Sequence, residues 1–107
     1  MKVGIDSLYN KRFDKLIRKE AFLRRVFNIS ELKVKRKLAG KFALKEAVMK
    51  ALGKKVNWKD IEILGREKPT IILSGNIKPK NFEYIEGSVS HDGEYTVAIV
   101  LIKTRER

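Results

Sequence analysis

The segment Lys41-Phe42-Ala43-Leu44-Lys45-Glu46-Ala47-Val48-Met49-Lys50-Ala51-Leu52-Gly53 decides the fold of this chain. It predicts a helix, because it consists of strong helix formers without proline and ends at Gly53, a residue suited to a C-terminal cap. One apolar face recurs at three- and four-residue spacing and contains Phe42, Ala43, Ala47 and Ala51. Glu46 and Lys50 are four residues apart, so their side chains are neighbours. This pair fits an ordinary surface ion pair, and it also suits a metal and phosphate site.

The chain before this segment predicts one strand followed by helices. Residues 2–5 predict a short strand, and residues 11–27 predict a helical region with an apolar stripe. Ser30 is a suitable N-cap for a helix from near Glu31 to Leu52, and we expect this helix to break around Ala39-Gly40.

The chain after Gly53 predicts strands. Its β-branched and aromatic segments are separated by Gly, Pro and Asn, and they cover residues 60–64, 70–73, 84–90 and 95–102. Asp92-Gly93 is a hairpin-turn signal before the last of them. The order of elements indicates an α+β fold in which helices pack on a mostly antiparallel sheet. With 107 residues we expect one domain, residues 1–107.

Composition excludes several classes of protein. The absence of cysteine excludes a disulfide framework, a thiolate metal site and a cysteine nucleophile. The sequence contains neither a signal-peptide apolar region nor an apolar run of membrane-spanning length. We therefore expect a cytoplasmic protein without a membrane partner.

The positive charge is concentrated in one part of the chain. The formal net charge is +12, and residues 11–41 contain 12 basic residues against three acids. Such a field attracts polyanions. A nucleic acid, an acidic protein and a phosphorylated small molecule fit it equally well.

Four motifs in order carry a resemblance to a known family. They are Gly4-Ile5-Asp6 with Arg12 six residues after the Asp, the helix quoted above, Trp58-Lys59-Asp60-Ile61-Glu62, and Ser90-His91-Asp92. Together they resemble the holo-acyl-carrier-protein synthase family of 4′-phosphopantetheinyl transferases. The resemblance extends from about residue 3 to residue 102.

The resemblance implies a 4′-phosphopantetheinyl transferase-like fold and a role in fatty acid biosynthesis. The implied reaction is Mg²⁺-dependent transfer of 4′-phosphopantetheine from coenzyme A to a serine of apo acyl carrier protein, with release of adenosine 3′,5′-bisphosphate. Family members of this length are typically homotrimers with active sites at the subunit interfaces, so the same assembly is expected here.

The resemblance also implies a metal site and a catalytic group. Asp6 and Glu46 match the acidic ligands of Mg²⁺, which prefers hard oxygen ligands and keeps several waters. Glu46, directly or through a water, is the candidate base for the serine hydroxyl, and Lys50 would stabilise charge on the leaving phosphate. Taken alone, Asp6 also fits a turn or cap residue. Tyr9 stands where many family members have a glutamate.

Further basic residues match binding positions of the family. His91 and Lys41 are assigned to coenzyme A, although a lone histidine is more often structural and the family typically has arginine at the position of Lys41. The 3′-phosphate would be bound by residues of one basic cluster, Lys33, Lys35, Arg36 and Lys37. The acidic carrier protein would dock on Arg12, Lys15, Arg18 and Arg25, together with Lys19.

Two rival functions remain open from the sequence. One is a small basic nucleic-acid-binding domain without catalysis, for which Tyr9, Phe13 and Phe22 are available to stack on bases. The other is an inactive relative that only binds carrier protein. The retained acids Asp6 and Glu46, with Lys50, favour the enzyme.

Overall fold

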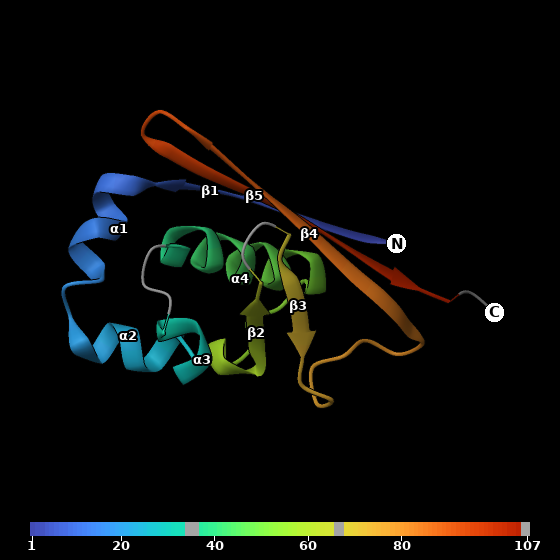
Figure 1. The fold of residues 1–107 in the computed structure, drawn as a ribbon. Coiled ribbons are helices and arrows are strands. Elements are labelled where there is room, and N and C mark those ends of the chain that lie inside the picture. The colour runs from blue at the N-terminus through green and yellow to red at the C-terminus, as the bar shows by residue number, and fades with distance from the viewer. Residues whose placement is uncertain (34–36, 66–67, 106–107) are drawn as a thin grey trace.

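A computed structural model describes residues 1–33, 37–65 and 68–105 (Figure 1). The elements follow in the order β1 (Lys2–Tyr9), α1 (Asn10–Leu16), α2 (Glu20–Val26), α3 (Ile29–Leu32), α4 (Leu38–Leu52), the 3₁₀ turn η2 (Trp58–Asp60), β2 (Ile61–Leu64), β3 (Thr70–Leu73), β4 (Phe82–Asp92) and β5 (Tyr95–Thr104). The predicted α+β fold with antiparallel strands is confirmed.

The main sheet has three antiparallel strands in the order β1-β5-β4, and β2 and β3 form a separate antiparallel pair. In β1 and β5 buried and exposed residues alternate, as expected for a sheet with one face on a core. The chain therefore presents one sheet face to its helices and leaves the other face bare.

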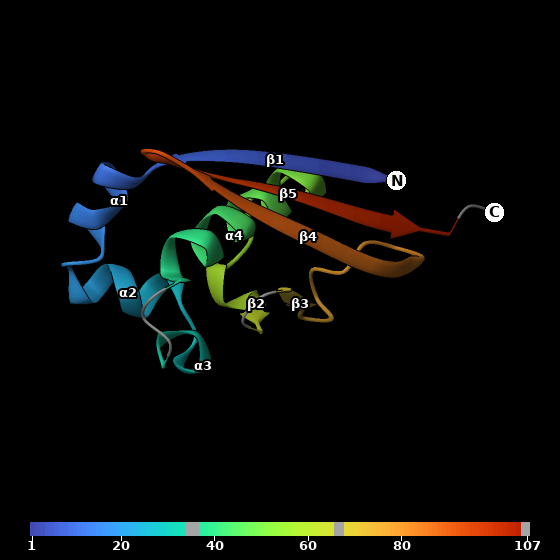
Figure 2. The ribbon, with the colours of Figure 1, turned by 45° about the horizontal axis from the view of Figure 1, so that its top comes forward.

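Helix α4 covers the inner face of this sheet, as Figure 2 shows. Its predicted apolar face is buried, since Phe42, Ala43, Ala47 and Ala51 are all at most 7% exposed. Gly53 ends the helix in the left-handed conformation (φ 74°), as predicted. Because α4 packs on both β1 and β5, it is the central element of the core.

A cluster of aromatic rings attaches the N-terminal helices to α4. The ring of Phe42 lies 5.2 Å from Phe13 of α1 and 5.6 Å from Phe22 of α2, measured between centroids. Phe42 also stacks on Trp58 of η2, with the ring centroids 5.1 Å apart. These contacts hold the basic helices α1 and α2 at one end of α4.

The predicted helix boundaries need two corrections. The region 11–27 is two helices, because Ile17 to Lys19 form a turn between α1 and α2. In place of the expected helix from Glu31 to Leu52, α3 ends at Leu32 and α4 begins at Leu38, and α4 continues through Ala39-Gly40, where we expected a break. Gly40 is instead buried inside α4, where a Cβ would lie 3.4 Å from Val89 of β4.

The predicted N-cap is wrong as well. Asn28 is the N-cap of α3, and Glu31 accepts a hydrogen bond from the Asn28 backbone N–H (2.7 Å) in a capping box. Ser30 lies within the helix, where its hydroxyl donates to Glu62 of β2. Asn28 rather than Ser30 is the N-cap because the Glu31 side chain accepts a hydrogen bond from the residue three positions before it.

Most strands are longer than predicted. β1 continues to Tyr9 because its pairing with β5 runs from Lys2↔Ile102 to Tyr9↔Tyr95, so Asp6 lies inside the strand rather than at its end. The hairpin turn of β4 and β5 forms at the predicted place, but its two loop residues are Gly93 and Glu94, since Asp92 still pairs with Tyr95. No helix in the described part of the chain is long and apolar enough to cross a membrane.

Candidate active site

Asp6 is turned inward from β1 toward α4. It lies opposite Ala98 of β5 and is 5% exposed, because the alternation of the strand puts Gly4, Asp6 and Leu8 on the covered face. A carboxylate in such a position requires a compensating charge. Lys50 supplies part of it, since its Nζ donates to Asp6 Oδ1 at 3.0 Å.

Glu46 lies one helical turn before Lys50 and within the field of Asp6. Burial raises the pKa of Glu46 above its ordinary value, and the negative charge of Asp6 adds to the rise. The charges of Lys50 and Arg12 act in the opposite direction on this pKa. The structure therefore brings Asp6, Glu46, Lys50 and Arg12 together, from β1, α4 and α1.

The two carboxylates fit a divalent cation. Asp6 Oδ2 is buried and has no hydrogen-bond partner among the described residues, so a lone pair remains available. A cation would also relieve the repulsion that raises the pKa of Glu46. Across residues 1–33, 37–65 and 68–105 no three His, Cys, Asp or Glu side chains could hold a metal together. Mg²⁺ suits this sparse set, because it keeps waters and takes phosphate oxygens as further ligands.

A pocket of about 490 Å³ opens beside these residues, and we name it the Glu46 pocket. Its lining includes Glu46, Lys50, Lys54, Lys55 and Trp58. Three lysines beside a carboxylate suit a ligand that carries phosphate groups. Sequence reasoning did not single out Lys54 and Lys55, although their position directly after the Gly53 cap keeps them next to the end of α4.

A second pocket, of about 590 Å³, lies at the other end of α4, and we name it the His91 pocket. It is bounded by α4, β2 and β4, and its charged lining among the described residues includes Lys37, Lys41, Lys68, Glu86 and His91. Lys41 is 7% exposed, and its Nζ donates to the backbone carbonyl of Glu31 at 3.2 Å. Lys68 was missed from sequence, since no spacing links it to the helix motif.

The ring of His91 has a defined orientation. Its Nδ1 lies 3.1 Å from Thr96 Oγ1, and the single hydroxyl proton of Thr96 is donated to Asn10 Oδ1 at 2.7 Å. Thr96 can therefore only accept, so Nδ1 of His91 donates to it. Nε2 is the ring nitrogen left for a ligand, and as a donor in the protonated ring it can bind a phosphate oxygen.

The predicted site residues thus fall into two groups. Asp6, Glu46 and Lys50 belong to the Glu46 pocket region, whereas Lys41 and His91 line the other pocket, and no residue that the structure describes lines both pockets. Lys33 is exposed after α3 and lines neither pocket. Lys35 and Arg36 lie outside the described residues.

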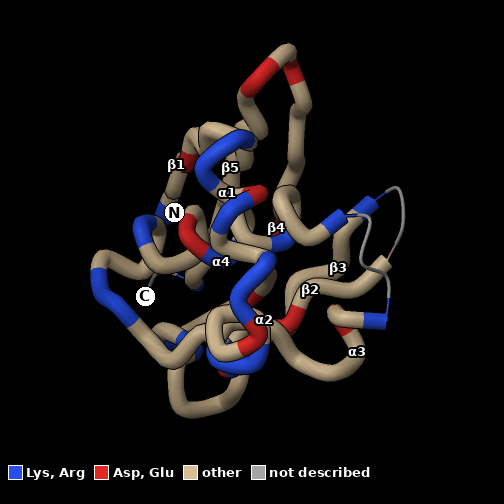
Figure 3. The backbone as a smooth tube through the Cα atoms, turned by 90° about the vertical axis from the view of Figure 1, so that its left-hand side faces the viewer, with Lys and Arg blue, Asp and Glu red and all other residues tan. Residues whose placement is uncertain are grey.

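The basic residues assigned to docking occupy one end of the molecule. Figure 3 shows Lys and Arg along α1 and α2, and the four docking candidates Arg12, Lys15, Arg18 and Arg25 are all exposed. The aromatic residues invoked for base stacking are engaged in contacts within the fold. Phe13 is 2% exposed, Phe22 packs against Phe13 and Phe42, and Tyr9 packs against Tyr95 at 5.5 Å. These contacts weaken the stacking part of the argument for a nucleic-acid-binding domain.

Comparison with known proteins agrees with this geometry. Residues 2–100 match the model of the 4′-phosphopantetheinyl transferase superfamily. The chain is 38% identical over 117 residues to a holo-[acyl-carrier-protein] synthase of Oceanobacillus iheyensis, covering 97% of each chain. It is 34% identical over 116 residues to the holo-[acyl-carrier-protein] synthase of Caldanaerobacter subterraneus, covering 92% of this chain and 91% of the relative.

Solved structures show the same relationship. The fold is similar to the Helicobacter pylori holo-[acyl-carrier-protein] synthase in complex with coenzyme A, with a TM-score of 0.85, 33% identity and coverage of 94% of this chain and 99% of the other. It is also similar to the Bacillus anthracis synthase in complex with coenzyme A (3′,5′-ADP), with a TM-score of 0.80, 28% identity and coverage of 97% and 96%. The chain therefore belongs to the 4′-phosphopantetheinyl transferase superfamily and is a phosphopantetheinyl transferase of the holo-[acyl-carrier-protein] synthase kind.

Proposed function

We propose that residues 1–107 form one domain that transfers 4′-phosphopantetheine from coenzyme A to a serine of apo acyl carrier protein in an Mg²⁺-dependent reaction. The serine oxygen bonds to the β-phosphorus of coenzyme A, and the bond from this phosphorus to the bridging oxygen breaks. Adenosine 3′,5′-bisphosphate leaves with the bridging oxygen. The observation that carries the proposal is the buried Asp6 Oδ2, which has no hydrogen-bond partner in the described part of the chain and lies beside Glu46 and Lys50.

Each residue of this group has a distinct role. Glu46 accepts the serine proton, directly or through a water. Lys50, 57% exposed in its side chain, reaches from Asp6 toward solvent and can bind the leaving phosphate. Asp6 and Glu46 would hold Mg²⁺, which when bound neutralises charge on the pyrophosphate.

Conversion of apo to holo carrier protein, with and without EDTA, tests this reaction, and chromatography identifies the nucleotide released. A product other than adenosine 3′,5′-bisphosphate would contradict the proposed bond cleavage. The cytoplasmic location and the role in fatty acid biosynthesis stay predictions.

The division of the site residues supports an assembly with active sites between subunits. Coenzyme A would place its phosphates against Lys50 of one subunit and against Lys41 and His91 of the next, so that two pockets of different chains form one site. We propose the homotrimer that the family resemblance implies. The bare face of the main sheet supplies an apolar surface for it, with Val3 and Ile5 of β1 at 55% and 57% exposure and Ile99 of β5 at 42%.

A charge on this face should separate the subunits. Ile5→Glu places a carboxylate in the centre of the proposed interface, where burying it without a partner costs several kcal/mol (about 3). We expect light scattering after gel filtration to give the monomer mass for the variant and the trimer mass for the wild type. Ile72→Glu is the matched control, since Ile72 is 44% exposed on β3, outside the main sheet. A wild-type monomer would refute the assembly.

Docking of the acidic carrier protein is assigned to the exposed residues Arg12, Lys15, Arg18 and Arg25. Arg12→Glu should raise the KM for carrier protein about tenfold or more, and should raise the KM for coenzyme A less, because a like charge now faces the partner. Lys80→Glu makes the same charge change on an exposed residue ahead of β4 and should leave both values unchanged. An equal rise of both KM values for Arg12→Glu would argue against the docking role.

A further inference from the structure

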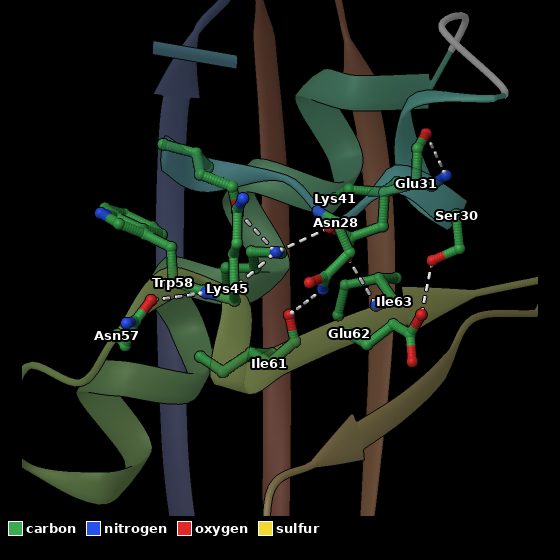
Figure 4. Close-up of polar contacts among 12 residues, drawn as sticks. Asn28, Ser30, Glu31, Lys41, Lys45, Asn57, Trp58, Ile61, Glu62 and Ile63 are labelled. Carbon is green, nitrogen blue, oxygen red and sulfur yellow. Dashed lines mark hydrogen bonds and ion pairs between the residues drawn. The ribbon is translucent and has the colours of Figure 1, made fainter. Parts of the chain in front are cut away.

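A buried ion pair connects the elements that carry the two pockets. Lys45 Nζ and Glu31 Oε1 are 2.8 Å apart, and both side chains are 0% exposed (Figure 4). Neither residue lines the Glu46 pocket or the His91 pocket, so the proposed reaction makes no use of them. A buried pair is costly unless every donor and acceptor is satisfied, and an apolar pair of similar volume is often at least as stable. A contribution to stability alone therefore does not explain it.

Lys45 attaches α4 to three other elements. Besides Glu31 of α3, its Nζ donates to the backbone carbonyl of Val26 at the end of α2 (2.7 Å) and to that of Trp58 in η2 (3.1 Å). An ammonium group has three donors, so its hydrogen-bonding capacity is complete. Burial lowers the pKa of Lys45, while the hydrogen bond to Glu31 and the charge of Glu31 act against this.

Glu31 is equally well satisfied. Its Oε1 also accepts from the Asn28 backbone N–H (2.7 Å), and its Oε2 accepts from the Ile63 backbone N–H of β2 (2.7 Å). Its own backbone carbonyl accepts from Lys41 Nζ (3.2 Å). Glu31 thus fixes α3, β2 and α4 against one another.

These contacts reach both pockets. Lys41 and Ile63 line the His91 pocket, and Trp58 lines the Glu46 pocket. Glu46 follows Lys45 directly in α4, and a rotation of the helix moves all its side chains together. We propose that Glu31 and Lys45 are positioning residues that hold α4 in one rotation, and so place Lys41 and Glu46 correctly for coenzyme A. This inference rests on the proposed function.

The test is the double variant Glu31→Gln/Lys45→Met, which removes both charges while nearly keeping the side-chain volumes. No charge of this pair remains unpaired in the core, so we expect a cooperative thermal transition. Measured well below that transition, the KM for coenzyme A should rise about tenfold and kcat should fall about tenfold, because small misplacements of reacting groups cost this much. A merely structural pair would lower the melting temperature and leave KM and kcat of the folded protein unchanged, and that result would overturn the inference.

Two further variants sharpen the test. Glu83→Gln/Arg105→Met removes an ion pair whose Arg105 side chain is 77% exposed, and it should leave both kinetic constants unchanged. Glu31→Asp keeps the charge but shortens the reach to Lys45 and Ile63, so it should show a smaller rise in KM. If the double variant does not fold, Glu31→Asp replaces it as the test. A KM for coenzyme A equal to that of the wild type would then overturn the inference.

Calorimetry with coenzyme A separates this inference from the proposed function. A wild-type protein that binds coenzyme A without transferring its phosphopantetheine would refute the proposed function. The positioning role would still be judged by affinity, which should fall about tenfold in Glu31→Gln/Lys45→Met. Equal affinity of variant and wild type would refute it.

Discussion

Glu46→Gln is expected to reduce phosphopantetheine transfer by about a thousandfold or more, because it removes both the proton acceptor and one carboxylate of the proposed Mg²⁺ site. The substitution keeps the shape of the side chain. It also removes a group whose pKa is raised in the folded protein, first by burial and then by Asp6. Such a carboxyl holds its proton more tightly in the folded than in the unfolded chain, so its ionised form at neutral pH opposes folding.

The effect of Glu46→Gln on the melting temperature gives a second readout. Without metal at pH 7, Glu46→Gln should melt no lower than the wild type. As the pH falls from 7 through the raised pKa of Glu46 toward its ordinary value near 4.5, Glu46 becomes protonated in the folded protein, and the wild type should gain stability. The difference in melting temperature between the variant and the wild type should therefore shrink. Added Mg²⁺ should raise the melting temperature of the wild type more than that of the variant.

Glu83→Gln is the control for this prediction, since Glu83 pairs with Arg105 at the surface. It should retain transfer at the wild-type rate. Transfer by Glu46→Gln at a near wild-type rate would refute the catalytic role of Glu46. A large loss of stability in the same variant would instead indicate that Glu46 holds the fold.

Gly4→Ala is expected to cause the largest loss of stability, about 3 kcal/mol or more. A Cβ at Gly4 would lie 1.9 Å from the backbone oxygen of Ala47 and 2.6 Å from the backbone nitrogen of Ala51. The obstacle is the backbone of α4, so no side chain can move to make room. For a domain of this size we expect the melting temperature to fall by about 15 °C.

The same substitution should also damage the site, because Asp6 follows Gly4 by two residues on the same face of β1. Moving β1 away from α4 separates Asp6 from Glu46 and Lys50, so the remaining folded protein should lose its response to Mg²⁺. Gly75→Ala is the matched control, since a Cβ at Gly75 would meet nothing within 4 Å and the φ of this residue is not positive. Equal melting temperatures for the two variants would contradict the close packing of β1 on α4.

The sequence predicted the fold class and helix α4 well for a physical reason. A helix that consists of strong helix formers, with an apolar face and a glycine cap, depends on local residue preferences, and these are visible within one segment of sequence. The full length of β1, by contrast, depends on a partner that is distant in sequence. β1 reaches Tyr9 only because β5 pairs with it along its whole length.

Residues of the candidate site that belong to sequence motifs could be predicted. Residues that reach it only through tertiary contacts could not. Asp6, Glu46 and Lys50 meet as expected, because the strand and the helix that carry them pack together. The place of Lys68 in the His91 pocket and the burial of Lys45 have no local signature. A lysine in an amphipathic helix is ordinarily exposed. Lys45 can be buried because hydrogen-bond acceptors from α2, α3 and η2 surround its ammonium group.

The most direct test of the account is the intact mass of apo acyl carrier protein after incubation with this protein, coenzyme A and Mg²⁺. We expect the carrier protein to gain about 340 Da, the mass of one phosphopantetheinyl group transferred to a serine, and we expect EDTA to abolish the gain. No gain with several apo carrier proteins would contradict the proposed transfer, and an equal gain in EDTA would contradict the metal site of Asp6 and Glu46.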